Sequence, residues 1–123
     1  MRKPVLLVDD NVMFLDSARD VLEGEGYAVI TAQSGEEALG LIRGQDFSAV
    51  LMDIKMAGIN GVETFVQMKQ IKPDVRVIMC TAHIVEDLIR LAESEGAFAI
   101  LKKPVKIEIL LDVMERALKP ALP

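Results

Sequence analysis

The sequence contains one cysteine, one histidine and no long apolar run, and each shortage excludes a class of protein. Cys80 alone cannot form an internal disulfide, and together with His83 it cannot supply the ligands of a structural zinc site. No segment approaches the roughly 20 apolar residues that cross a bilayer, and the first apolar run ends at Asp9, too early for a secretory signal. We therefore expect a cytoplasmic protein that makes no contact with a membrane.

Basic residues are also few relative to acidic ones. The chain has 14 Lys and Arg residues against 19 Asp and Glu residues, a net charge of -5, so we expect no direct contact with nucleic acid. With 123 residues, 51% of them apolar, the chain is long enough for one globular domain with a buried core. We place that domain at residues 1–119 and interpret residues 120–123 as a C-terminal tail or the start of a linker.

Short apolar runs alternate with helical patterns along the whole chain. The apolar runs occupy residues 5–8, 27–32, 49–52, 75–80 and 97–101. The helical patterns occupy residues 12–23, 34–43, 62–71, 85–95 and 107–118. Ser34 opens the second helical pattern as a cap, and Glu37 follows at the spacing of a capping box. Because several apolar runs are continuous, they are typical of strands covered on both faces. The sequence predicts an α/β, doubly wound fold with a five-stranded parallel sheet and five helices.

Polar side chains follow four of the predicted strands. The first strand is followed by Asp9 and Asp10, the third by Asp53, the fourth by Thr81 and the fifth by Lys103. The carboxyl ends of parallel strands share one edge of the sheet, where ligands bind. Three carboxylates form a hard-oxygen site suited to Mg²⁺ or Mn²⁺, and the ammonium group completes the charge balance. We therefore expect a metal site at this edge.

A site of this kind favours phosphoryl chemistry. Asp53 stands alone at the end of a central strand, so we interpret it as a nucleophile that forms an acyl phosphate. The adjacent pair Asp9 and Asp10 is better suited to holding the metal. The Thr81 hydroxyl can donate to one phosphoryl oxygen, and the Lys103 ammonium can pair with another.

Four motifs carry a resemblance to a known family. They are VLLVDDN (5–11), LMDIKMAGING (51–61), IMCTA (78–82) and LKKPV (101–105). Together they resemble the receiver domains of two-component response regulators, over essentially the whole chain. The resemblance implies the strand order 2-1-3-4-5 and a phosphorylation-dependent signalling switch. It implies that Asp53 accepts a phosphoryl group from a histidine kinase, from a histidine phosphotransfer protein of a phosphorelay, or from a small phosphodonor.

The resemblance also implies roles for single residues. Asp10 binds Mg²⁺ directly, Asp9 acts partly through water, and the backbone carbonyl of Lys55 completes the metal site. Thr81 is the switch hydroxyl, and Lys103 is the phosphate-binding lysine. Such a domain is not a conventional enzyme, but it catalyses its own phosphorylation and dephosphorylation and signals to a downstream effector domain or protein.

The chain departs from the family pattern at several positions. Ala57 stands where the family usually has proline, Ile100 replaces the usual tyrosine or phenylalanine of the fifth strand, and Val105 replaces a phenylalanine. Isoleucine has no ring to swing, so coupling between the switch hydroxyl and an aromatic ring is not expected here. Lys55 and His83 occupy two variable positions that influence the phosphoryl lifetime in this family.

Aliphatic residues remain on the fourth helix, fifth strand and fifth helix after the inward stripes are assigned. They are Ile84, Leu91, Ile100, Ile109 and Val113. We expect this face to dock a partner or a second copy of the chain as a homodimer.

Three other classes stay open at this point. A pseudo-receiver would signal without phosphate, although no acidic residue of the site is missing. A phosphohydrolase of the haloacid dehalogenase type would also use an aspartate nucleophile, but it has an Asp-x-Asp spacing in place of the adjacent Asp9 and Asp10. A flavodoxin-like cofactor binder would need a phosphate loop rich in Ser, Thr or Gly after the first strand, where this chain has DDNVMF.

Overall fold

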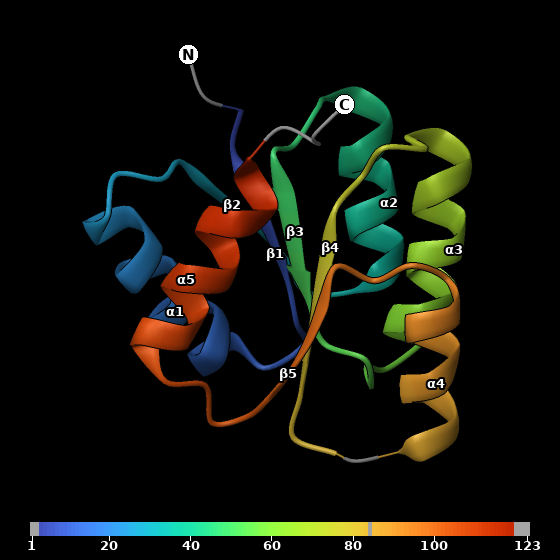
Figure 1. Cartoon of the computed structure of the whole chain (residues 1–123). Coiled ribbons are helices and arrows are strands. Elements are labelled where there is room, and N and C mark those ends of the chain that lie inside the picture. Colours follow the sequence, from blue (N-terminus) through green and yellow to red (C-terminus); the bar gives the residue numbers. More distant parts are fainter. Residues whose placement is uncertain (1–2, 84, 120–123) are drawn as a thin grey trace.

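The computed structural model describes residues 3–83 and 85–119 (Figure 1). Along the chain the elements are β1 (Val5–Val8), α1 (Val12–Gly24), β2 (Val29–Ala32), α2 (Gly35–Gly44), β3 (Ala49–Met52), α3 (Gly61–Ile71), β4 (Val77–Thr81), α4 (Glu86–Ser94), β5 (Ala99–Lys102) and α5 (Ile107–Leu118). The predicted tail at 120–123 and the predicted surface residue Ile84 lie outside the described residues. Within the described ranges, no helix has the length and apolar character needed to span a membrane.

The sheet is parallel throughout, with the strand order β2-β1-β3-β4-β5. This confirms the predicted α/β fold and the order implied by the resemblance. The register aligns Val8 at the end of β1 with Ala32 of β2 and Met52 of β3. Thr81 at the end of β4 is aligned with Lys102 of β5. All strands therefore end at one edge, and the residues that follow them come together there.

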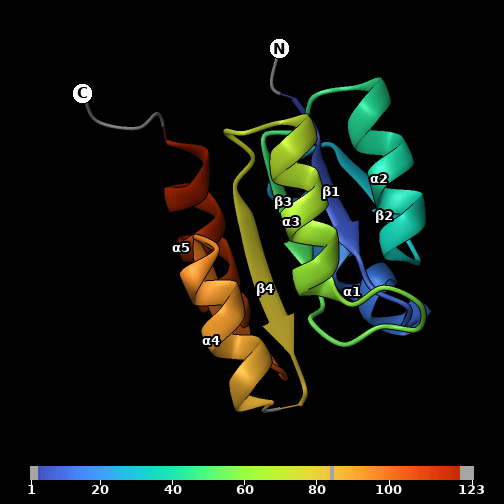
Figure 2. The same cartoon turned by 90° about the vertical axis from the view of Figure 1, so that its right-hand side faces the viewer.

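Helices cover both faces of the sheet (Figures 1 and 2). On one face, Leu6 and Val50 belong to the apolar core that includes side chains of α2, α3 and α4. On the other face, Leu7, Leu51 and Ile78 belong to the core beneath α1 and α5. Alternate residues of each strand thus enter different cores, which explains why the strands are continuously apolar instead of alternating.

Three strands begin later than their apolar runs. The runs starting at residues 27, 75 and 97 become strands only at Val29, Val77 and Ala99. The reason is visible in the backbone, because the first residues of these runs close the preceding turn. The N–H groups of Tyr27, Val75 and Ala97 donate to Leu22, Lys72 and Ala92 at 3.0 Å each. These donors are therefore engaged at the C-terminal ends of the preceding helices or their caps, and the strand ladders begin after them.

The helix caps agree with the sequence in part. Ser34 caps α2 by accepting the Glu37 N–H at 3.0 Å, as predicted. The Glu37 carboxylate, however, accepts the N–H of Gln33 and not that of Ser34. A reciprocal capping box occurs instead at α3, between Asn60 and Glu63.

The prediction that Val113 lies on the surface is wrong. Val113 is only 4% exposed and packs in the core beneath α5. The buried stripe of this helix consists of Leu110, Val113, Met114 and Ala117. Ile107, at the start of the same helix, is 53% exposed. The buried stripe therefore includes Val113, which faces the sheet, and leaves Ile107 outside it.

Cys80 is a buried part of β4, as its apolar surroundings indicate. Burial raises the pKa of its thiol to about 12, so the group stays protonated at neutral pH.

Candidate functional site

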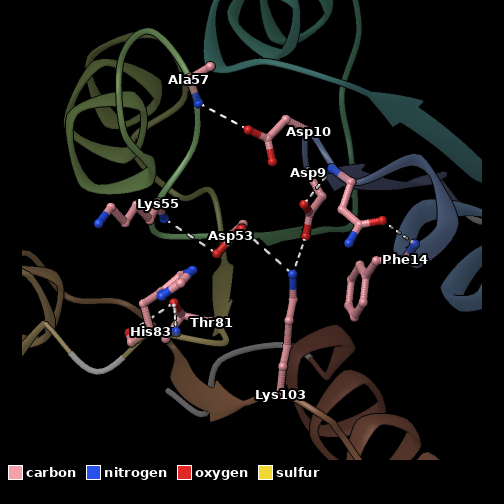
Figure 3. A network of polar contacts seen from close by, with 10 residues as sticks. Asp9, Asp10, Phe14, Asp53, Lys55, Ala57, Thr81, His83 and Lys103 are labelled. Atoms are coloured by element: carbon pink, nitrogen blue, oxygen red, sulfur yellow. Dashed lines mark hydrogen bonds and ion pairs between the residues drawn. The ribbon is translucent and has the colours of Figure 1, made fainter.

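The predicted side chains converge at the carboxyl edge of the sheet (Figure 3). Asp9, Asp10, Asp53 and Lys103 line one pocket of about 450 Å³ there, together with His83. These groups follow the ends of four strands and lie far apart in the sequence. The convergence follows from the parallel register, because each strand delivers its next residue to the same edge.

The three aspartates form an acidic cluster. One carboxylate oxygen from each of Asp9, Asp10 and Asp53 lies within 4.8 Å of the other two. Asp9 is 1% exposed and Asp53 is 7% exposed, whereas Asp10 is exposed. Burying like charges this close is unfavourable without a compensating cation. The cluster could therefore hold a metal ion, and its all-oxygen composition fits Mg²⁺.

Lys103 provides part of the compensation. Its Nζ donates to Asp9 Oδ2 at 2.5 Å and lies 3.6 Å from Asp53 Oδ2. The third neighbour is Phe14, whose ring centroid is 4.1 Å from the same nitrogen. The side chain of Lys103 is only 13% exposed, so one ammonium is held between two carboxylates and an aromatic face.

The surroundings of Asp53 and Lys103 raise the pKa of both side chains. Burial raises the pKa of the Asp53 carboxyl, and the charge of Asp9 raises it further, against the opposing effect of Lys103. Burial lowers the pKa of Lys103, but the hydrogen bond and charge of Asp9 outweigh that effect, and its pKa is raised. Lys103 is therefore cationic at neutral pH, while the ionised form of Asp53 is disfavoured relative to an exposed aspartate.

Backbone N–H groups donate to three further carboxylate oxygens. Asp9 Oδ1 accepts the N–H of Asn11 at 2.9 Å, so both oxygens of Asp9 are engaged. Asp53 Oδ1 accepts the N–H of Lys55 at 3.3 Å. Asp10 Oδ2 reaches the opposite loop and accepts the N–H of Ala57 at 3.1 Å. Proline at this position could not make the last contact, because it has no N–H.

Close packing fixes the backbone next to Asp53. A Cβ atom at Gly61 would lie 2.2 Å from the Asp53 carbonyl oxygen. The Gly61 N–H also donates to the carbonyl of Ile54 at 2.6 Å. Only glycine permits this approach, so the first residue of α3 lies directly against the backbone that carries Asp53.

Thr81 reaches the same edge from β4 and is 2% exposed. Its Oγ1 accepts the N–H of His83 and donates to the His83 carbonyl, both at 3.1 Å. The His83 residue is exposed, as predicted for a loop position. Ile100 is half-buried and packs against the core on the α4 side of the sheet. On the outer face of this region, Leu91 and Ile109 are 48% and 46% exposed.

Three residues that contact the aspartates or Lys103 were not predicted from the sequence in these roles. Asn11 is the N-cap of α1, Phe14 lies in the first turn of that helix, and Ala57 lies in the loop after β3. Asn11 and Ala57 act through backbone N–H groups, which every residue except proline carries. A phenylalanine one helical turn after an acidic pair was the available signal for Phe14.

Comparisons with known proteins agree with this geometry. The model of the response regulator receiver domain family matches residues 5–115. A response regulator receiver protein of Anaeromyxobacter sp. (strain Fw109-5) is 36% identical over 108 residues, which are 88% of this chain and 45% of that protein. The sporulation initiation phosphotransferase F of Bacillus subtilis (strain 168) is 31% identical over 118 residues, 96% of this chain and 95% of that protein.

A solved structure gives the same result at the level of the fold. The CheY-like response regulator receiver domain protein of Methanospirillum hungatei JF-1 superimposes with a TM-score of 0.92 at 32% identity, covering 96% of this chain and 94% of that one. The chain spans less than half of the Anaeromyxobacter relative and 26% of a transcriptional regulatory protein that it also matches. The family match over most of the chain and the shared fold establish that this chain belongs to the response regulator receiver domains of two-component signalling.

Proposed function

We propose that this receiver domain is a phosphorylation-dependent switch whose phosphoacceptor is Asp53. The observation that carries the proposal is the setting of its carboxylate, which is nearly buried among Asp9, Asp10 and the Lys103 ammonium. An oxygen nucleophile with a fixed cation beside it is suited to phosphoryl transfer, where charge develops on the transferring oxygens. The donor is a phosphohistidine of a histidine kinase or of a histidine phosphotransfer protein, or a small acyl phosphate.

In the transfer step, an Asp53 carboxylate oxygen attacks phosphorus as the bond from phosphorus to the donor breaks. The donor atom, a histidine nitrogen or an acetate oxygen, leaves with the electron pair of that bond. The product is an acyl phosphate on Asp53, and hydrolysis by water later restores the carboxylate. Lys103 stands 3.6 Å from Asp53 Oδ2 and pairs with a phosphoryl oxygen during and after the step.

The acidic residues fit the Mg²⁺ that this family implies. Asp10 and Asp53 would bind it through carboxylate oxygens and Lys55 through its backbone carbonyl, while Asp9 acts partly through water. Asp9 suits the indirect role because Asn11 and Lys103 already engage both of its oxygens. When bound, Mg²⁺ supplies positive charge to the carboxylates and to the phosphoryl oxygens.

The switch itself is assigned to Thr81. Its hydroxyl now bonds to the backbone of His83, at the start of an exposed loop, and an exchange of that partner for a phosphoryl oxygen would pull the loop inward. Ile100 lies on the neighbouring strand β5 and adjusts by packing without a moving ring. Lys55 and His83, which border the pocket, influence how long the phosphoryl group survives.

The output surface is the face of α4, β5 and α5, where Leu91 and Ile109 are exposed. Changes at Thr81 reach this face through the loop between β4 and α4. A downstream effector domain or protein binds it, or a second copy of the chain forms a homodimer there. The substitution of Ile109 by Glu tests this assignment by the oligomeric state and partner affinity of the phosphorylated form.

The primary test is intact-mass measurement after incubation with acetyl phosphate and Mg²⁺. We expect wild type to gain one phosphoryl group and Asp53→Asn to gain none. Asp74→Asn is the matched control, since Asp74 is exposed in the loop before β4, at the opposite edge of the sheet. No added mass on wild type, from either acetyl phosphate or a phosphorylated histidine protein, contradicts the proposal. Steady release of phosphate from unrelated esters would instead indicate a phosphohydrolase.

A further inference from the structure

Lys103 has to hold its ammonium in one place although its side chain is long and flexible. A lysine ammonium is a compact point charge on a four-carbon stem, with no planar fork to fix its direction. Its two carboxylate partners do not hold it equally, since Asp9 Oδ2 is at 2.5 Å and Asp53 Oδ2 is at 3.6 Å. The shorter contact draws the ammonium toward Asp9, so a third contact that opposes this movement would favour its place beside Asp53.

The ring of Phe14 also lies against the ammonium, with its centroid 4.1 Å from Nζ (Figure 3). The electron-rich face of an aromatic ring attracts a cation, and the attraction grows when water is excluded. At 13% exposure, the Lys103 side chain is largely withdrawn from water. We propose that Phe14 is a positioning residue, whose ring holds the Lys103 ammonium where it pairs with the phosphoryl group on Asp53. This inference rests on the proposed function of Asp53.

A closed circuit of contacts fixes the ring. Asp9 Oδ1 accepts the Asn11 N–H at 2.9 Å, and Asn11 Oδ1 accepts the Phe14 N–H at 3.2 Å. The Phe14 ring contacts the Lys103 ammonium, which returns to Asp9 Oδ2. The circuit joins the first turn of α1 to the loop after β5, so the backbone that carries the ring is tied to the same aspartate that holds Lys103.

Ring electronics separate this role from simple packing. Fluorination of the Phe14 ring weakens its attraction for a cation while largely keeping its shape. There is room for the fluorine atoms, because Phe14 also borders an apolar cavity of about 460 Å³ between α1 and the start of α5. A series with zero, one, three and five fluorines can therefore be introduced at position 14 in the full chain. Phe14→Leu, which has no ring, and Phe14→Trp, whose ring attracts a cation most strongly, extend the series at its weak and strong ends.

The measurement is the rate of phosphorylation by acetyl phosphate with Mg²⁺, followed by intact mass. We expect the rate to fall with each fluorine and to be about threefold to tenfold lower in Phe14→Leu, the factor that such a contact contributes when partly desolvated. Phe14→Trp should be at least as fast as wild type. In NMR spectra, the ε-methylene protons of Lys103 should be shifted upfield by the ring in wild type and return to ordinary values in Phe14→Leu. Fluorination at Phe47, half-buried near the opposite edge, is the control and should change neither readout.

Two failures are distinguishable. A wild type that gains no phosphoryl mass overturns the proposed function, and this inference with it. A wild type that is phosphorylated, with rates independent of fluorination in folded variants, overturns the role of Phe14 alone. Equal melting temperatures across the fluorine series identify the folded variants, so a destabilised Phe14→Leu does not decide the outcome.

Discussion

The acidic cluster predicts a specific response of stability to Mg²⁺. Each pair of carboxylates within 4.8 Å repels by about 3 kcal/mol at an effective dielectric near 20. Lys103 supplies one positive charge against three negative ones, so two negative charges remain uncompensated. A divalent cation supplies that amount. Because only the folded chain brings the three aspartates together, Mg²⁺ binding should raise the free energy of unfolding.

The size of the effect follows from binding linkage. At a free Mg²⁺ concentration ten times the dissociation constant, the stabilisation is about 1.4 kcal/mol. For a chain of 123 residues, that corresponds to a rise of about 5 °C in melting temperature. The substitution Asp10→Asn should remove most of this rise. Without Mg²⁺, the same variant should be as stable as wild type or more so, because it relieves repulsion and keeps an oxygen for the Ala57 N–H.

Differential scanning calorimetry with EDTA and with 10 mM Mg²⁺ is the assay, with ionic strength held constant by NaCl. Asp74→Asn, an exposed aspartate away from the cluster, should keep the full rise. A wild-type melting temperature that ignores Mg²⁺ would refute the reasoning. The reasoning would also be refuted if Asp10→Asn lowered the melting temperature in EDTA by as much as it reduced the rise caused by Mg²⁺. Asp10 would then stabilise the fold directly and not through the metal.

Other predictions follow from the same geometry. Burial and Asp9 raise the pKa of Asp53 above its ordinary value near 3.8, so the folded state binds this proton more tightly than the unfolded chain. In the absence of Mg²⁺, the stability of wild type relative to Asp53→Asn should therefore fall as pH rises through that raised pKa and should not change further above it. Urea unfolding of both proteins from pH 3 to 7 measures the difference. Ala57→Pro removes the N–H that competes with Mg²⁺ for the Asp10 carboxylate, so it should tighten Mg²⁺ binding about threefold in an NMR titration. Unchanged affinity would show that this hydrogen bond does not compete. Gly61→Ala should lower the free energy of unfolding by about 1 to 3 kcal/mol, because its Cβ would meet the Asp53 carbonyl. Gly40→Ala should raise the free energy of unfolding by about 0.5 to 1 kcal/mol, because this position lies inside α2 with open space around it. Equal effects of these two substitutions in urea unfolding would contradict the close approach.

Most of the fold could be predicted from the sequence because strands buried on both faces are apolar at nearly every position. Runs such as VLLV and AVLM are apolar at every position, as expected of strands covered on both faces. The starts of β2, β4 and β5 could not be predicted, since they depend on backbone N–H groups that close the preceding turns. Val113 was misplaced because two helical stripes of α5 share Leu110 and Met114, and the sequence does not decide between them.

The main residues of the site were predictable for a topological reason. Parallel strands end at one edge, so polar residues directly after them must meet there, and Asp53 and Lys103 do. Contacts from outside the strand ends were not predictable in the same way. The contact between the Phe14 ring and Lys103 depends on how α1 packs beside the loop after β5, which no sequence pattern specifies. The contact between Asp10 and Ala57 depends on the path of a loop, which carries no periodic pattern.

The close approach of Gly61 gives the neighbourhood of Asp53 one stiff side and one compliant side. Toward α3, the backbone of Asp53 meets Gly61 with no free space, and a hydrogen bond of 2.6 Å to Ile54 ties the two segments together. Toward β4, the Thr81 hydroxyl bonds to the backbone of His83, which lies in an exposed loop. If Asp53 is phosphorylated, the α3 side has no room to change, so the rearrangement would be confined to the loop between Thr81 and α4, which would move inward as Thr81 turns to the phosphoryl oxygen.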